Sequence, residues 1–295
     1  MERSQPFFSI IIPTYNRPAE LVLCLEALCR LDYPRDLFEV IVVDDGCKTS
    51  LQTIVACFLD QLDVTLLTQA NAGPAAARNK GASQAKGEFL AFIDDDCMTF
   101  PDWLQKLANR LAEIPDQAIG GRTLNPLPEN PYSTASQTLI NAGYAYYNSL
   151  PSQASFFASN NLTVPAAYFR SIGGFDITFR TSEDRDFCDR WRHQGFRMTY
   201  APEILLYHSH PLNFLAFWRQ HFNYGKGAFR YHQARARRGT GRLRPDPKFY
   251  RSLFFNSLMN EPKRRGLWVK MLLLISQVAN AAGFSCEGFN RIRRK

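Results

Sequence analysis

Short, almost continuous apolar runs recur between residues 8 and 93, and the segments between them have helical spacing. The runs that we expect to form strands are FSIII at 8–12, EVIVV at 39–43, VTLL at 64–67 and FLAFI at 89–93. Runs of this kind are typical of parallel strands that are buried on both faces. The alternation therefore predicts successive βαβ units and an α/β fold with a doubly wound sheet.

Helical spacing fills the intervals and continues beyond the fourth run. Leu21, Leu25 and Leu28 indicate a helix within 19–31, and residues 144–147 lie in a helical stretch after a Pro- and Asn-rich connection. Further helices are expected at 51–59, 74–85, 102–112, 166–172 and 182–194, with strands at 118–122 and 204–208. With 45% hydrophobic residues, 295 residues can form one large α/β domain with an appendage, or two small domains.

The net charge of +8 is distributed unevenly. Residues 211–295 contain 18 Lys and Arg against three acidic residues, a charge of +15, which leaves −7 for residues 1–210. A basic segment attached to a mildly acidic body indicates a second role in contact with an anionic partner.

Cysteines and the N-terminal residues indicate the compartment. The seven cysteines are scattered without a CxxC pair, which argues against a zinc site or a disulfide framework and favours a reducing environment. The apolar run before Pro13 has about six residues, too few for the core of a signal peptide. We therefore expect a chain that works inside the cell and begins directly in a strand.

Polar residues follow the expected parallel strands at one edge of the sheet. Residues 13–16 (PTYN) follow the first strand, Asp44 and Asp45 the second, and residues 94–96 (DDD) the run at 89–93. Five carboxylates in one cleft repel one another unless a cation or hydrogen-bond donors offset the charge. Carboxylates with this spacing suit Mg²⁺ or Mn²⁺, although an acidic triplet can also serve as turn and helix-capping residues.

Six motifs in order give the sequence a specific resemblance. They are SIIIPTYNR, FEVIVVDDG, NAGPAAARNKGA, GEFLAFIDDDCMTFPDWL, GGFD and SEDRDFCDRW. The series resembles the family-2 inverting glycosyltransferases of GT-A fold. The resemblance implies a catalytic domain over 1–210, with a nucleotide-sugar-binding half at 7–122 and an acceptor-side half at 123–210.

The resemblance implies donor contacts near the N-terminus. Pro13, Tyr15 and Asn16 would lie beside the nucleobase, and Asp45 would accept its imide N–H while Asp44 braces the turn. Both acids could instead cap the helix after Gly46.

Three further donor contacts are implied. Arg78, with the dipole of the helix that begins at Pro74, would favour an anion, unless it is a surface arginine. Asp96 best matches the metal ligand, while Asp94 and Asp95 match positions that assist the metal and the ribose. His208 or His210 could complete the metal shell, or both could be structural.

The resemblance also implies the catalytic and acceptor residues. Asp184 would act as the general base, with Glu183 orienting the acceptor, although acids also suit a helix N-terminus for electrostatic reasons. Asn160, Asn161 and Trp191 are the candidates for acceptor contacts, and turn formation accounts equally well for the two asparagines.

Residues 211–295 lie largely beyond the resemblance and are expected to form a basic, helical extension. Aromatic and basic side chains interleave from residue 214 to 230, five arginines lie within 235–244, and 267–284 is apolar apart from Lys270, Gln277 and Asn280. This pattern favours an interfacial helix on an anionic membrane. One alternative is a helical subdomain packed on the catalytic body. Another is RNA binding, but the sequence has no RNA-binding signature, so we expect no nucleic acid partner.

Together these features predict a glycosyltransferase that uses Mg²⁺ or Mn²⁺ and a nucleotide-diphospho-sugar, with UDP preferred. The acceptor is expected to be a saccharide or lipid-linked, and the enzyme to be cytoplasmic and peripheral on the inner face of the membrane. The alternatives are a sugar nucleotidyltransferase, which would carry a Gly-rich basic loop where residues 13–18 read PTYNRP, and a non-catalytic sugar- or lipid-binding protein.

Overall fold

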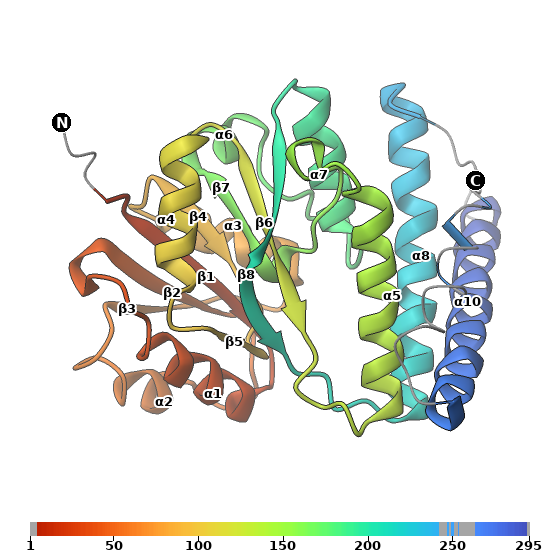
Figure 1. The fold of residues 1–295 in the computed structure, drawn as a ribbon, viewed down its shortest axis with the longest axis horizontal. Helices are drawn as coiled ribbons and strands as arrows, with labels where there is room; N and C mark the ends of the chain where they lie inside the picture. Colours follow the sequence, from red (N-terminus) through yellow and green to blue (C-terminus); the bar gives the residue numbers. More distant parts are fainter. Residues whose placement is uncertain (1–4, 242–246, 248, 251–252, 254–262, 294–295) are drawn as a thin grey trace.

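A mixed sheet forms the centre of the molecule (Figure 1). The computed structural model describes residues 5–241, 247, 249–250, 253 and 263–293. Within these residues the sheet has eight strands in the order β3-β2-β1-β4-β7-β6-β8-β5. The strands are β1 Phe8–Thr14, β2 Phe38–Asp44, β3 Val64–Thr68, β4 Phe89–Phe92, β5 Cys97–Thr99, β6 Ala118–Leu124, β7 Leu162–Pro165 and β8 Met198–His208.

The first four strands are parallel, as the sequence predicts. β1 pairs with β2 and β4, and β2 pairs with β3. Every residue of β1 and β2 is buried because helices cover both faces of this half. Ile10 and Ile12 belong to the same core cluster as Leu21 and Leu25 of α1, whereas Ile11 belongs to the cluster on the opposite face.

The second half of the sheet is mixed and was only partly expected. β7 runs antiparallel to β4 and β6, while β8 pairs parallel to β6 and antiparallel to β5. The sequence did not indicate β5 or β7, which have three and four residues. β8 begins at Met198, six residues before the expected start. Its pairing with β6 has a register shift between Gly120 and Arg122, and this irregularity obscures the strand pattern in the sequence before residue 204.

Helices cover the sheet and extend the molecule on one side. The helices around the sheet are α1 Pro18–Leu28, α2 Gln52–Ala56, α3 Pro74–Gln84, α4 Trp103–Glu113, α6 Ala166–Ser171 and α7 Glu183–His193. Short 3₁₀ turns occur at Arg35–Leu37, Pro151–Gln153 and Ser159–Asn161. α2 is shorter than the expected 51–59, and proline occupies the first turn of α1 and α3, where its missing N–H is tolerated.

Three long helices lie side by side at the other end of the molecule: α5 Pro131–Tyr147, α8 Phe214–Arg238 and α10 Lys263–Ile292 (Figure 1). Their shared core includes Ala135, Phe217 and Leu273. The Asn213 side chain caps α8 by accepting from the Ala216 N–H, and Gly239 ends the helix in a left-handed conformation. The expected C-terminal helical extension is therefore present and packed on the protein.

Two glycines allow α8 and α10 to come into backbone contact. A Cβ atom at Gly225 would lie 1.9 Å from the Asn280 carbonyl oxygen, and one at Gly283 would lie 1.9 Å from the Phe222 carbonyl oxygen. No side chain fits at either position unless the helices separate.

We expect Gly283→Ala to lower the free energy of unfolding by about 1–3 kcal/mol, because overpacking forces the backbones apart. Gly143→Ala in α5 is the matched control, since a Cβ there has nothing within 4 Å and alanine favours a helix by up to about 1 kcal/mol. Urea unfolding of the full-length variants measures both changes. Equal stability of the two variants would contradict the close helix contact.

Candidate active site

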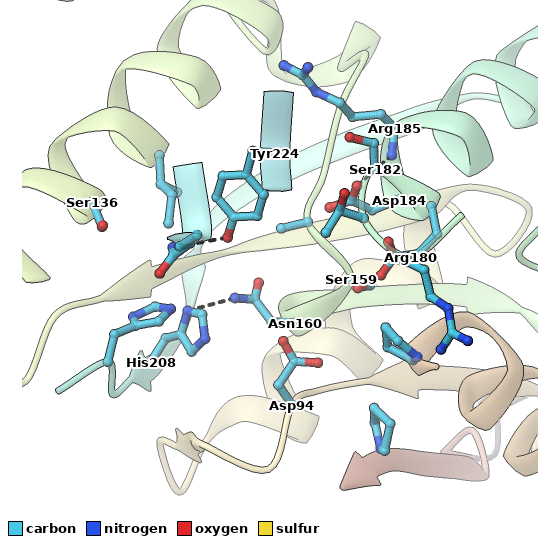
Figure 2. Close-up of a pocket in the computed structure, with 18 of the residues that line it drawn as sticks. Asp94, Ser136, Ser159, Asn160, Arg180, Ser182, Asp184, Arg185, His208 and Tyr224 are labelled. Atoms are coloured by element: carbon cyan, nitrogen blue, oxygen red, sulfur yellow. Dashed lines mark hydrogen bonds between the residues drawn. The ribbon is translucent and has the colours of Figure 1, made fainter. Parts of the chain in front are cut away.

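A cavity of about 720 Å³ lies where the carboxyl ends of β1, β2 and β4 meet the three long helices (Figure 2). We call its sheet side the strand-end wall, which includes Pro13, Tyr15, Asp45, Arg78 and Asp94. We call its other side the helix wall, which includes Ser136, Tyr144, Tyr147, His221 and Tyr224. Asp184, at the start of α7, lines the same cavity. Ligand sites in α/β sheets occupy this edge because loops from several strands converge there.

Arg17 neutralises part of the acidic triplet. Its guanidinium lies 2.9 Å from Asp95 Oδ1 and 2.6 Å from Asp96 Oδ2, and Thr14 Oγ1 donates to Asp95 Oδ2 at 2.8 Å. Burial nevertheless raises the pKa of Asp95 to about 7, outweighing the attraction of Arg17. Sequence reasoning overlooked Arg17, although it ends the motif SIIIPTYNR.

Asp96, His208 and His210 form a group that could hold a divalent cation. One ligand atom from each lies within 4.8 Å of the others, and His208 Nε2 lies 3.1 Å from Asp96 Oδ1. Asp96 Oδ1 is buried and lies against His208 Nε2, so a cation that replaces the His208 proton would meet an oxygen and an imidazole nitrogen together. Burial and the neighbouring His208 lower the pKa of His210 to about 3, which keeps its imidazole in the neutral form that binds metals. A carboxylate with two imidazoles suits a divalent first-row transition metal: the carboxylate is a good ligand for Mn²⁺, and the imidazoles favour the later ions of the series.

The protonation of this group is set by its neighbours. Burial alone would raise the pKa of Asp96, but His208 and Arg17 reverse that effect and hold it well below its usual value. Burial lowers the pKa of His208, and Asp96 more than compensates, so its pKa is raised. Asn160 Nδ2 lies 2.8 Å from His208 Nδ1 and orients the ring, as Figure 2 shows. Asp94, also expected as a metal ligand, is not part of this group.

Arg78 is a buried clamp rather than a surface arginine. It is 3% exposed, and its guanidinium donates to Asp94 Oδ1 at 2.5 Å and to Glu183 Oε1 at 3.0 Å. The clamp joins the acidic triplet to the start of α7. The Glu183 carboxylate therefore already has a hydrogen-bond partner within the protein.

Asp184 lies beside that clamp and faces the cavity (Figure 2). Burial raises the pKa of its carboxyl to about 7, and repulsion from Glu183 contributes. The Arg185 N–H donates to Asp184 Oδ1 at 2.7 Å, and Ser182 before it adopts a left-handed conformation with φ of 68°. A partly exposed carboxylate with a pKa near neutrality can accept a proton from a bound ligand.

α8 braces the segment before Asp184. Thr181 Oγ1 donates to the Asn223 carbonyl at 2.9 Å, and a Cβ at Gly227 would lie 2.4 Å from Thr181 Oγ1. A helix from the C-terminal extension therefore helps to position the segment that carries Asp184.

The residues expected at the nucleobase have different surroundings. Tyr15 is 47% exposed and lines the cavity with Pro13. Both oxygens of Asp45 are occupied, because they accept four bonds from the loop that contains Gln69, Asn71, Ala72 and Gly73. A base contact through Asp45 stays a prediction and requires one of these bonds to be exchanged.

Asp44 and Asn16 hold the neighbouring turns. Asp44 Oδ1 accepts from the Cys47 N–H at 2.7 Å, and Asn16 Oδ1 accepts from the Lys48 N–H at 2.8 Å. Neither residue lines the cavity.

Two expected acceptor residues lie away from the cavity, and that expectation is corrected. Trp191 is 0% exposed in the core beneath α7, and its Nε1 donates to the Arg197 carbonyl. Asn161 is buried, accepts from Trp103 Nε1 and donates to the Ile204 carbonyl, so its amide is used by the fold. The burial of Trp191 and the hydrogen bonds of Asn161 depend on tertiary contacts, which neither helical spacing nor a turn motif predicts. Asn160 does line the cavity.

Comparison with known proteins identifies relatives. The family model described as Glycosyl transferase family 2 matches residues 9–173. Glycosyltransferase AglE of Haloferax volcanii is 28% identical over 231 residues, which cover 77% of this chain and 74% of that protein. The chain spans about half the length of several other relatives. The validoxylamine A glucosyltransferase of Streptomyces hygroscopicus, for example, is 29% identical, and the match covers 67% of this chain and 54% of that protein.

Solved structures share the fold. The mannosyltransferase PcManGT from Pyrobaculum calidifontis, in complex with GDP-Man and Mn²⁺, matches with a TM-score of 0.64 at 19% identity, over 95% of this chain and 76% of that one. This likeness confirms the GT-A fold.

We expect Mn²⁺ to bind the wild-type protein and Asp96→Asn to weaken that binding at least about tenfold, because one ligand and its charge are lost. Calorimetry with Mn²⁺ alone measures the effect, and Asp60→Asn, at an exposed acid outside the cavity, is the control. UDP should bind only with the metal present. UDP binding that is equally tight in EDTA would contradict this assignment.

Proposed function

The chain belongs to glycosyltransferase family 2, and on this premise we propose that it transfers a sugar from a nucleoside-diphosphate sugar, preferably UDP-linked, to an acceptor hydroxyl with inversion. The observation that carries the proposal is the cavity itself. It brings Asp94, Asp95 and the Arg78 clamp together with Asp184, a carboxylate whose pKa is raised to about 7.

The strand-end wall suits a nucleotide donor. Tyr15 offers a flat, half-exposed ring for the base. Arg180 packs against Gly73 at the N-terminus of α3, where a cation and the helix dipole favour a diphosphate. A divalent cation held by Asp96, His208 and His210 would neutralise charge on the leaving diphosphate.

Asp184 suits the role of the single base. The acceptor oxygen attacks the anomeric carbon, its proton passes to Asp184, and the bond to the diphosphate oxygen breaks with its electron pair leaving on that oxygen. One carboxylate suffices because the diphosphate leaves without protonation, whereas glycosidases need two. Glu183 is held by Arg78 and supports this role by positioning the loop.

The two alternative functions are less well supported. A sugar nucleotidyltransferase would carry a Gly-rich basic loop after β1, where this chain has PTYNRP. A non-catalytic binding protein would have no requirement for Asp184, which the first experiment below tests.

The acceptor and the location are part of the same proposal. We propose a saccharide or lipid-linked acceptor in polysaccharide or glycolipid synthesis, at the cytoplasmic face of a membrane. From Gly266 to Ile292, α10 is long and apolar enough to cross a bilayer by length and composition alone. One face packs on α8 and α5, while the other exposes apolar side chains: Leu267, Trp268, Met271, Leu274, Val278, Phe289 and Ile292. A packed helix with an exposed apolar face supports peripheral attachment.

We expect Asp184→Asn to lower turnover by about 10² or more while donor affinity changes little, since only the proton acceptor is removed. Nucleotide release in a screen of UDP-, GDP- and dTDP-sugars with Mg²⁺ or Mn²⁺ measures turnover. Asp116→Asn, at an exposed acid in the turn between α4 and β6, is the control. Turnover within about threefold of wild type would place the base elsewhere.

The pH profile gives a second test of Asp184. Since the base must be ionised, kcat/KM should fall as the pH drops below about 7, well above the usual range of an aspartate. A profile that stays flat down to pH 5 would contradict the raised pKa.

We expect full-length protein to sediment with anionic vesicles at low salt and to be released as salt screens the basic extension. Replacing Leu267, Leu274 and Val278 with Glu should abolish sedimentation. The matched control replaces Leu23, Leu59 and Ile177, equally exposed residues elsewhere, with Glu and makes the same charge change. Equal sedimentation of the two triple variants would exclude α10 as the attachment face.

A further inference from the structure

The helix wall contains two buried polar atoms that have no hydrogen-bond partner in the described part of the protein. They are Ser136 Oγ in α5 and His221 Nε2 in α8. Ser136 is 2% exposed and His221 is 4% exposed, and both residues line the cavity. Buried polar groups are nearly always paired, so two unpaired ones facing one cavity indicate a ligand that supplies the missing partners.

His221 is held in a fixed orientation and in its neutral form. Its ring packs edge-on against Phe217 at a centroid distance of 4.4 Å and against Tyr224 at 5.7 Å. Burial lowers its pKa to about 4, so at neutral pH it offers a hydrogen bond without charge.

Aromatic side chains surround these polar atoms. Tyr224 lies in the same part of the cavity, where its hydroxyl accepts from Gln220 Nε2 at 3.1 Å (Figure 2). Tyr144, Tyr147 and Phe156 complete this lining. Flat apolar faces beside uncharged hydrogen-bonding groups suit a ring that carries hydroxyl groups.

Charge divides the cavity into two parts. The arginines that line it in the described residues come from the strand-end wall and from the segment around α7: Arg17, Arg78, Arg180 and Arg185. The lining residues of α5, α8 and α10 in the same described set are uncharged. The guanidinium of Arg185 lies over the rings of Tyr147 and Phe156. The part of the lining without an arginine is therefore the one around Ser136, His221 and Tyr224. A phosphate is bound best by arginine, so this part favours a neutral ligand over a phosphorylated one.

We propose that Ser136, His221 and Tyr224 form an acceptor subsite that binds an uncharged saccharide ring and directs one of its hydroxyl groups toward Asp184. This inference rests on the proposed function and deepens it, because it selects a neutral saccharide over a lipid phosphate as the group at the reaction centre. The three residues determine acceptor specificity. Ser136 lies within the family-matched segment, whereas His221 and Tyr224 of α8 lie outside it.

The first experiment uses the donor found by the nucleotide-release screen and compares acceptor probes. The probes are methyl glycosides of glucose, mannose, galactose and N-acetylglucosamine, with farnesyl phosphate as the lipid-phosphate probe. We expect at least one glycoside, and not farnesyl phosphate, to stimulate nucleotide release. Stimulation by farnesyl phosphate alone would overturn the inference while leaving the proposed glycosyl transfer intact.

The second experiment asks which step the subsite residues affect. Ser136→Ala and His221→Phe should each raise KM for the stimulating glycoside about tenfold, while the donor KM stays within about twofold. Thr138→Ala, whose hydroxyl bonds within α5, and His232→Phe are matched controls outside the cavity. His232 is a partly buried histidine of α8 whose pKa is also lowered to about 4 and whose Nδ1 has no partner in the described residues. An unchanged glycoside KM, or an equal rise in the donor KM, would overturn the assignment.

A third measurement does not depend on turnover. In ligand-observed saturation-transfer NMR, the glycosides should receive saturation from the wild-type protein and lose it with His221→Phe but not with His232→Phe. Equal saturation by all three proteins, or none from the wild type, would overturn the subsite. Absence of nucleotide release with every donor, alongside normal glycoside saturation, would instead count against the proposed function.

Discussion

Two arginines hold the acidic side chains of this site together. Arg17 lies between Asp95 and Asp96, and Arg78 bridges Asp94 and Glu183, so the acidic triplet and the start of α7 are held in one piece. Carboxylates this close would repel one another in a buried setting, and each arginine offsets part of that repulsion. Burial, with the remaining repulsion added to it, raises the pKa of Asp95 and of Asp184 to about 7. The remaining negative charge is what a divalent cation and a proton from an acceptor would relieve.

The C-terminal helices are part of this arrangement. α8 supports the loop before Asp184 through Thr181 and the close approach at Gly227, and α10 is held to α8 by Gly225 and Gly283. A change on α10 can therefore reach that loop through α8. The family-matched segment ends at residue 173, so the part of the cavity formed by α8 and α10 belongs to the sequence outside it.

The parallel half of the fold was predictable because its strands are buried on both faces and leave uninterrupted apolar runs. The half that contains antiparallel strands was only partly predictable. β5 and β7 are too short to show an alternating pattern, and the register shift between β6 and β8 obscures where β8 begins. Acids at strand ends were visible in the sequence, but their partner Arg17 was not. Neither was His221 on the helix wall. Both residues have ordinary local sequence surroundings, and their importance comes only from their positions in the folded protein. Trp191 and Asn161 failed as acceptor candidates for the same reason: their surroundings are set by tertiary packing.

The central claim is that Asp184 alone takes the acceptor proton as the acceptor attacks opposite the leaving diphosphate. The most direct test is the stereochemistry of the product, observed by proton NMR of the anomeric signal during turnover of an α-linked nucleotide sugar. Single displacement with one base predicts a β-linked product from the first turnover. An α-linked product would require a second nucleophile or a different path and would contradict this account.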